Sequence, residues 1–412
     1  MLTQRLPVPP DRGDRIRSFH LLRQLGKRFA ITLACVSEHE PTAEQREMLA
    51  ELVAWSEVRV IDPRTARRRS VAALMRGRAA TPTWFFRRDL ARTLLARHRL
   101  DPFDAVLTFC SGMIGYADAV LRATPADQPR PRHVLDLVDV DSSKWGAYAR
   151  RRSLGGLDPM RWVYAAEARR LRPVEAGESV PFDRVTVVSE REANEYRRTI
   201  GEDPRLTVVS NGVELEAYTP RRGPELDPAA PRVVFVGQMD YPPNVAAVRW
   251  FARHVWAKLR AEVPAAVFRI VGRAPTREVR SLASRVGVEV TGEVPSVIDE
   301  LHAATVVVAP LRIARGVQNK VLEAMAAARP VICSPQAYEG VGGLRGSELL
   351  VADTPEQWVR DVVSLLRDPA RRSHIGHAAR SRVEKDRPWD VALAPMADLL
   401  APPSAHQLPR VA

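Results

Sequence analysis

Short valine-rich apolar runs alternate with longer amphipathic stretches along almost the whole chain, and this alternation restricts the folds that it can adopt. Apolar runs without polar alternation are typical of strands buried on both faces of a parallel sheet, covered by amphipathic helices. The expected strands lie at 29–36, 105–109, 133–137, 184–188, 206–209, 232–237, 267–272, 288–292, 305–310 and 330–334. Helical patterns occupy 244–262, 276–286 and 319–328. The sequence therefore predicts an α/β fold.

Turn formers and prolines interrupt this pattern in SNGVELEAYTPRRGPELDPAAP, residues 210–231. Because 412 residues are enough for two domains, we expect a Rossmann-like domain at 1–210, a linker at 211–231 and a second Rossmann-like domain at 232–387. The last helical pattern, about 388–402, should pack back on the first domain. Two such domains are expected to face each other across a cleft at their carboxyl strand ends, where open α/β sheets bind ligands. MLTQR leaves a very short first strand, so we expect the true start upstream.

The chain is basic, with 62 Lys and Arg against 49 Asp and Glu. This excess favours an anionic partner, such as nucleic acid, a membrane surface or a phosphorylated ligand, although arginine abundance throughout the chain explains it equally well. No apolar run is long enough for a membrane-spanning helix, and the first residues lack an export signal. The three cysteines have neither disulfide nor metal-site spacing. We expect a cytoplasmic protein without a bound metal.

Residues 64–99 interleave arginines with apolar and aromatic side chains. Such a segment can lie on an anionic membrane surface with its aromatic residues in the interface. Two ordinary surface helices whose apolar faces enter the core give the same pattern, and we favour that interpretation. The membrane alternative would place the protein at the inner face of the cytoplasmic membrane.

Two glycine loops enter helices in a manner that suits phosphate or sugar. Gly13 precedes an amphipathic helix and has Arg12, Arg15 and Arg17 nearby, while Gly237 follows the expected strand VFVG. Backbone N–H groups and the positive end of a helix dipole favour anions at such places, although a plain strand-to-helix turn looks the same. Neither GxGxxG nor GxxxxGK[ST] occurs, which argues against dinucleotide oxidoreductases and P-loop enzymes.

The segment LVDVDSSKW contains a pair of aspartates, Asp139 and Asp141. Such a pair can bind a divalent metal beside a diphosphate, but two carboxylates are few ligands for one ion. Our preferred role is that of a carboxylate that orients or deprotonates an acceptor hydroxyl. A helix cap formed by Asp141 or Ser142 is compatible with either role.

The chain resembles the GT-B glycosyltransferases of family 4 (group 1), most closely the sugar transferases associated with PEP-CTERM/exosortase exopolysaccharide systems. The resemblance covers nearly the full length. Its motifs are TQRLPVPPDRGDRIRSFHLLRQL, LDLVDVDSSKWGAYARR, VTVVSEREA, VVSNGVELEAY, FVGQMDYPPNVAAVRWF and APLRIARGVQNKVLEAMAAARPVICS, with EG at 339–340. Each motif is weak or moderate alone, but their order and spacing make a strong match.

The resemblance implies a nucleoside-diphosphate sugar donor held mainly by the second domain and an acceptor held by the first. Glu323 would bind the ribose hydroxyls of the donor nucleotide. From their own sequence context, Gly13 and Asp141 are our candidates for substrate binding in the first domain. Other donor residues in the corresponding loops would be Gly237, Gln238, Asn244, Arg273, Gly292, Gly316, Gln318 and Asn319.

Two departures from the family concern charge. Family members usually carry a glutamate where this chain has Arg315, and a basic pair where it has the neutral Gln238 and Asn244. Fixed cations near a leaving diphosphate lower the barrier to its departure. We therefore hypothesise that Arg315 and Lys320 are catalytic and that the diphosphate clamp has moved to their loop. Alternatively, Arg315 changes the choice of sugar.

The resemblance implies a retaining, metal-independent transferase in exopolysaccharide or cell-surface glycan synthesis, with a lipid-linked or polysaccharide acceptor. Asp139 would orient that acceptor. A GT-B nucleotide-sugar epimerase shares the architecture and is the first alternative. A basic nucleic-acid-binding protein is the second, but the chain has no nucleic-acid-binding fold signature and no basic stripe with stacking aromatic residues.

Overall fold

The computed structural model describes all residues except 12, 154–157, 222, 224–229, 315 and 402–412. The chain divides into two compact units. The first contains Met1–Ser210 together with Leu393 and the described residues after it, and the second contains Asn211–Ala392. The sequence expected as a linker at 211–231 thus groups with the second unit. No helix among the described residues is both long enough and apolar enough to cross a membrane.

The first unit is built on a seven-stranded parallel sheet in the order β3-β2-β1-β4-β5-β6-β7. Its elements in chain order are β1 (Leu2–Thr3), α1 (Gly13–Leu25), β2 (Thr32–Ser37), α2 (Ala43–Leu52), β3 (Trp55–Val60), α3 (Pro63–Met75), α4 (Ala80–Phe85), α5 (Arg88–Leu100), β4 (Ala105–Phe109), a 3-10 helix (Ser111–Met113), α6 (Ile114–Ala123), β5 (Arg132–Val138), α7 (Asp141–Ser153), α8 (Met160–Glu175), β6 (Arg184–Val187), α9 (Glu190–Thr199) and β7 (Leu206–Val208). Strand order reverses between β1 and β4.

The second unit has a six-stranded parallel sheet in the order β10-β9-β8-β11-β12-β13, with its reversal between β8 and β11. Its elements are β8 (Arg232–Val236), α10 (Pro242–His254), α11 (Trp256–Glu262), β9 (Val267–Val271), α12 (Arg277–Arg280), a 3-10 helix (Ser281–Ser284), β10 (Val288–Gly292), α13 (Val297–His302), β11 (Val306–Ala309), α14 (Asn319–Ala326), β12 (Val331–Cys333), α15 (Pro335–Val341), β13 (Leu350–Val351), α16 (Pro355–Arg367), α17 (Pro369–Asp386) and the start of α18 (Trp389–Leu400).

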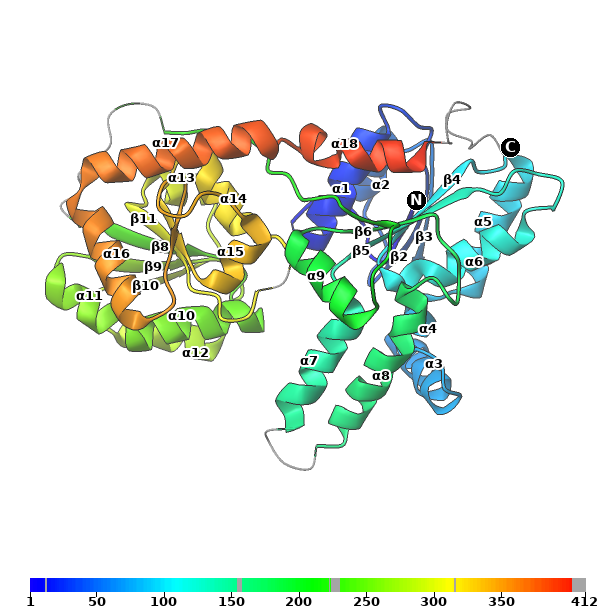
Figure 1. Cartoon of the computed structure of the whole chain (residues 1–412), viewed down its shortest axis with the longest axis horizontal. Helices are drawn as coiled ribbons and strands as arrows, with labels where there is room; N and C mark the ends of the chain where they lie inside the picture. The colour runs from blue at the N-terminus through cyan, green and yellow to red at the C-terminus, as the bar shows by residue number, and fades with distance from the viewer. Residues whose placement is uncertain (12, 154–157, 222, 224–229, 315, 402–412) are drawn as a thin grey trace. The chain divides into compact units, whose positions relative to one another are not determined.

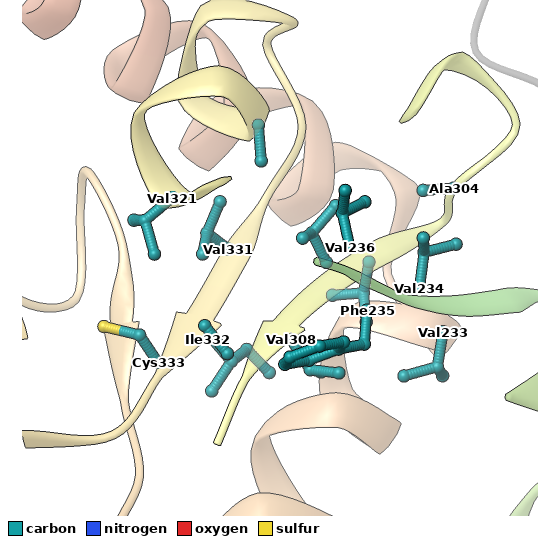
Figure 2. Close-up of a cluster of buried hydrophobic side chains, with 14 of the residues drawn as sticks. Val233, Val234, Phe235, Val236, Ala304, Val308, Val321, Val331, Ile332 and Cys333 are labelled. Carbon is teal, nitrogen blue, oxygen red and sulfur yellow. The ribbon is translucent and has the colours of Figure 1, made fainter. Parts of the chain in front are cut away.

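Helices cover both faces of each sheet, so the central strands are buried throughout (Figure 1). Figure 2 shows the result in the second unit, where consecutive residues of β8 from Val233 to Val236 all lie in one cluster with Val308 of β11. Val321 of α14 belongs to the same cluster. This packing explains why the apolar runs do not alternate with polar residues.

A fully buried ion pair joins α1 to the sheet in the first unit. The Arg17 guanidinium donates to both carboxylate oxygens of Asp136 on β5, at 2.9 and 3.0 Å. Thr186 of β6 donates a third hydrogen bond to Asp136 at 2.9 Å. Both charged side chains are inaccessible to solvent. Arg17 therefore has a structural role, and the idea that it attracts an anion to the Gly13 loop is wrong.

The aromatic residues in segment 64–99 point inward. Trp84, Phe85 and Phe86 pack against a buried cluster of the first unit, which agrees with the favoured interpretation of two ordinary helices. The large apolar side chains that this segment leaves exposed are Val71 and Met75. These three aromatic side chains are partly buried, so they offer a membrane less surface than the exposed Val71 and Met75 do.

Candidate functional site

The candidate site lies where the strand order of the second sheet reverses. In a doubly wound sheet the loops that leave the carboxyl ends of the two strands at the reversal diverge to opposite faces, and ligands bind between them. Here these loops follow β8 and β11. The first leads into α10 and the second into α14, so the beginning of each helix contributes side chains to this edge of the sheet.

The glycines after β8 and β9 let the backbone approach closely. Gly272 has φ +147°, and a Cβ atom on it would lie 1.7 Å from the carbonyl oxygen of Gly237. No side chain is compatible with that contact. At Gly237 itself, a Cβ would lie 2.7 Å from Asn244 Nδ2 and 2.8 Å from Lys320 Nζ. The absence of a side chain at Gly237 therefore leaves room for the two polar groups.

Lys320 connects the two loops. Its Nζ donates to Asn244 Oδ1 at 2.6 Å, and Asn244 Nδ2 in turn donates to the carbonyl of Gln238 at 2.8 Å. The ammonium also lies 4.5 Å from the centre of the Phe235 ring, a favourable cation–π distance. Enclosure by protein lowers the pKa of Lys320 to about 7, although Glu323 opposes this change. A lysine in this state can gain or lose its proton near neutral pH.

Glu323 lies one helical turn after Lys320 on α14. Burial raises the pKa of its carboxyl to about 7, while Lys320 and a hydrogen bond from Tyr218 act in the opposite direction. The same environment raises the pKa of the Tyr218 phenol, through burial first and through Glu323 second. Tyr218 is thus the donor that holds the Glu323 carboxylate.

The other residues assigned to the donor surround this group to different extents. Asn319 accepts a hydrogen bond from Asn211 at 3.4 Å, and Gln318 immediately precedes α14. The backbones of Arg273 and Gly292 bond to the neighbouring strand ends, through Met239 N to Arg273 O and Gly272 N to Gly292 O.

The loop before α14 is held against α15. A Cβ on Gly340 would lie 2.0 Å from the carbonyl oxygen of Gly316, so the glycine of the EG pair permits this contact. Arg315 lies outside the described residues.

The aspartate pair of the first unit lies at the carboxyl end of β5. Val138 adopts φ +66° just before Asp139, a conformation that is strained for a β-branched residue. Asp141 accepts a hydrogen bond from Ser111 Oγ at 2.6 Å, and its other oxygen lies 3.6 Å from Lys144 Nζ.

Lys144 interacts electrostatically with both aspartates. Burial lowers its pKa, but Asp141 and then Asp139 outweigh that effect, so that the pKa rises. An ammonium thus lies beside the two carboxylates that were considered for a metal. No three His, Cys, Asp or Glu side chains form a potential metal-binding group in the part of the chain that the structure describes. Gly13 begins α1, and open space surrounds the position of its missing Cβ.

A well-formed cavity of the first unit lies elsewhere. It measures about 430 Å³ and lies at the amino-terminal edge of the first sheet, where its lining includes Met1, Leu25, Phe29, Phe103 and Leu400. Ligands of doubly wound sheets bind at the opposite edge. We therefore place the candidate site by side-chain chemistry and strand order, not by cavity size.

The comparisons with known proteins concern the fold and the family. Residues 230–368 match the family model described as Glycosyl transferases group 1. The chain is also 30% identical, over 254 residues, to a D-inositol 3-phosphate glycosyltransferase from Streptomyces bingchenggensis (strain BCW-1). That match covers 53% of this chain and 52% of the relative, about half the length of each.

Solved structures resemble the whole chain. Anabaena Alr3699/HepE in complex with UDP and glucose has a TM-score of 0.66 at 12% identity, covering 97% of this chain and 98% of that one. Sucrose-phosphate synthase from Thermosynechococcus elongatus has a TM-score of 0.66 at 14% identity, covering 97% of both chains. WaaG, a glycosyltransferase involved in lipopolysaccharide biosynthesis, has a TM-score of 0.65 at 13% identity, covering 97% and 100%.

These likenesses identify the class of the protein. Two parallel sheets with flanking helices, matching glycosyltransferase structures over nearly their full length, make this a GT-B fold. Residues 230–368, which match the family model of group 1 glycosyl transferases, contain Lys320 and Glu323. The predicted α/β fold class is confirmed.

Removing both charges of this site tests whether they contribute to stability. No ion pair within 4 Å joins Lys320 and Glu323, so each charge bears its own cost of desolvation. Replacing such opposite charges together by uncharged groups of similar size should be neutral or stabilising, as for buried ion pairs, where the gain is up to about 1–4 kcal/mol. We expect this outcome for the double variant Lys320→Met/Glu323→Gln.

The raised pKa of Glu323 lowers the free energy of unfolding as pH rises from 4.5 through about 7. The lowered pKa of Lys320 lowers it as pH falls from 10.5 through about 7. Both costs are present near pH 7, so the stability gained by the double variant should be largest there. Urea denaturation across this pH range measures it.

The exposed pair Lys258 and Glu356, 2.8 Å apart, provides the matched control. Lys258→Met/Glu356→Gln should change the free energy of unfolding by less than about 0.5 kcal/mol at any of these pH values. A loss of more than about 2 kcal/mol in the site variant would show instead that the pair stabilises the fold.

Proposed function

We propose that the protein is a glycosyltransferase that moves a sugar from a nucleoside-diphosphate sugar to a lipid-linked or polysaccharide acceptor. The observation that carries the proposal is the group formed by Lys320, Asn244 and Glu323 within the group 1 domain. It places a cation donor and a carboxylate acceptor one helical turn apart at a ligand-binding strand edge. The relatives support the donor class, because HepE was solved with UDP and also with UDP-glucose.

The two charged side chains match the two polar parts of a nucleoside diphosphate. A carboxylate can accept hydrogen bonds from two ribose hydroxyls, and in this proposal Glu323 does so while Tyr218 fixes its orientation. Lys320 interacts with the diphosphate next to the Gly237 loop. Arg315 supplies the second cation, as the sequence suggests. Since Lys320 contacts Asn244, the diphosphate clamp draws on both loops.

In the proposed reaction the sugar is transferred with retention and without a metal. The acceptor oxygen forms a bond to the anomeric carbon as the bond from that carbon to the diphosphate breaks. The acceptor proton passes to a phosphate oxygen of the leaving group. Lys320 stabilises the negative charge that the diphosphate gains. Asp139 orients the acceptor hydroxyl, with Lys144 beside the aspartate pair.

The acceptor and the cellular role follow from the family resemblance. We propose exopolysaccharide or cell-surface glycan synthesis of the PEP-CTERM-associated type, at the inner face of the cytoplasmic membrane. WaaG, a structural neighbour, is described as involved in lipopolysaccharide biosynthesis. Such acceptors carry lipid, so a peripheral contact with the bilayer would bring enzyme and acceptor together.

A thermal-shift panel of UDP, GDP, ADP and dTDP tests the donor class. One base should raise the melting temperature of the protein, because a ligand at about a hundred times its Kd stabilises the folded state by about 2.7 kcal/mol. Glu323→Ala should abolish that rise, whereas the exposed control Glu356→Ala should retain it. A flat panel combined with stabilisation by RNA would refute the proposal. Epimerisation of a labelled donor without transfer would favour the epimerase.

Turnover tests the role of Lys320 separately from binding. If its ammonium stabilises the leaving diphosphate, Lys320→Ala should lower kcat by about 10²–10³-fold. The Kd for the nucleoside diphosphate should change far less. Arg315→Ala should behave in the same way. Unchanged turnover in either variant would remove that residue from the proposed clamp.

A further inference from the structure

The helical hairpin of α7 and α8 is anchored to the first unit near Ser142 and Glu175. The two helices pack side by side and extend away from the sheet of the first unit (Figure 1). At the anchored end, Ser142 N and Oγ donate to the buried carboxylate of Glu175, the N–H bond at 3.0 Å. Further along α8, Glu167 accepts hydrogen bonds from the backbones of Ala80 and Thr81 at 2.6 and 2.8 Å.

The apolar side chains in the first turn of α8 are more exposed than those nearer the anchor. Leu171 is fully buried and Ala168 is 6% exposed, whereas Val163 is 37%, Met160 40% and Trp162 66% exposed. Four of the twelve exposed large apolar side chains in the described part of the chain lie on this hairpin, the fourth being Tyr148 of α7. Met160, Trp162 and Val163 all lie in the first turn of α8, and exposed apolar side chains gathered in this way mark an interaction surface more strongly than single exposed residues do.

The charge of the hairpin is strongly basic. Between Asp141 and Glu175 the sequence has eight Lys and Arg against four Asp and Glu. Two of those acids, Glu167 and Glu175, are buried in the anchoring hydrogen bonds. On α8 the Arg161 guanidinium lies 4.7 Å from the centre of the Trp162 ring. Arg169 follows Trp162 after two helical turns and thus lies on the same face.

We propose that this surface docks on an anionic lipid bilayer. The hairpin patch comprises the residues Tyr148, Met160, Arg161, Trp162, Val163 and Arg169. Tryptophan and tyrosine favour the membrane interface, methionine and valine add apolar area, and arginines are attracted to anionic headgroups. Charge complementarity selects a negative surface. The inference specifies the membrane contact of the proposed function but does not depend on the donor site.

The patch differs from the surface of segment 64–99. That segment exposes Val71 and Met75 while its aromatic residues pack inward. Aliphatic side chains lack the amphipathic character that holds tryptophan at the headgroup level. Variants in the two surfaces therefore give a direct comparison within one unit.

Vesicle co-sedimentation of the full chain tests the proposal. Vesicles of equal parts phosphatidylglycerol and phosphatidylcholine should bind the wild-type protein, and pure phosphatidylcholine should bind it much less. Met160→Ala/Trp162→Ala should weaken binding by about tenfold or more through lost apolar area. Arg161→Gln/Arg169→Gln should weaken it by roughly fivefold per charge, and added salt should have the same effect. The control Val71→Ala/Met75→Ala should bind like the wild type.

Several outcomes would overturn the proposal. The first is that the patch variants bind vesicles as well as the wild type does, and the second is that the control variant loses binding. The third is that the wild type binds no vesicles but forms a dimer that the Trp162 variant loses. Because Trp162 is 66% exposed, its replacement should leave the melting temperature unchanged. Nucleoside-diphosphate binding measured on the same variants distinguishes a failure here from a failure of the proposed donor site, which the hairpin variants should not affect.

Discussion

Two opposite charges on α14, Lys320 and Glu323, are held where protein restricts their hydration, and the arrangement of the candidate site in the second unit depends on this. Desolvation moves the pKa values of Lys320 and Glu323 toward 7 from opposite sides, so neither charge is firmly fixed at neutral pH. The protonation state of such a side chain changes when a charged ligand group binds beside it, since an interaction of about 1.4 kcal/mol moves its pKa by one unit. Perturbed titratable groups of this kind concentrate at functional sites.

The surroundings of Lys320 are arranged to hold its ammonium near the backbone of the β8 loop. Gly237 has no side chain, and Asn244 bonds to Gln238 and Lys320 at the same time. In the first unit an ion pair has a different role, since Arg17 and Asp136 share two hydrogen bonds and are both inaccessible to solvent. Arg17 and Asp136 fix a helix on the sheet, whereas Lys320 and Glu323 are only half-buried and can be reached by a ligand.

The sequence predicts those parts of the fold that depend on local periodicity. The buried strands of the second sheet were found because continuous apolar runs leave few alternatives. The edge strand β3, WSEVRV, was missed because it contains no continuous apolar run and is only partly buried. The expected helix at 244–262 breaks at Val255, which caps both α10 and α11. Tertiary packing decides such boundaries.

The site was only partly predictable for the same reason. Lys320 and Glu323 were named from the resemblance, but the contact of Lys320 with Asn244, 76 residues away, depends on the sheet order. Tyr218 lies in a segment that looked like a linker, and its bond to Glu323 left no pattern in the sequence. Segment 64–99 and the hairpin of α7 and α8 both mix arginine with apolar residues, and only burial distinguishes them.

Proton uptake on nucleotide binding tests the account most directly. Isothermal titration of the stabilising nucleoside diphosphate slightly above pH 7, in buffers of different ionisation enthalpy, reports the number of protons exchanged. If Lys320 is partly neutral in the free protein and meets the diphosphate as an ammonium, it should take up protons, whereas Glu323 should release them when it binds ribose as a carboxylate. The wild-type protein should therefore show a more positive net uptake than Lys320→Met. Equal net proton exchange and equal affinity in the wild type and Lys320→Met would contradict the central role of this lysine.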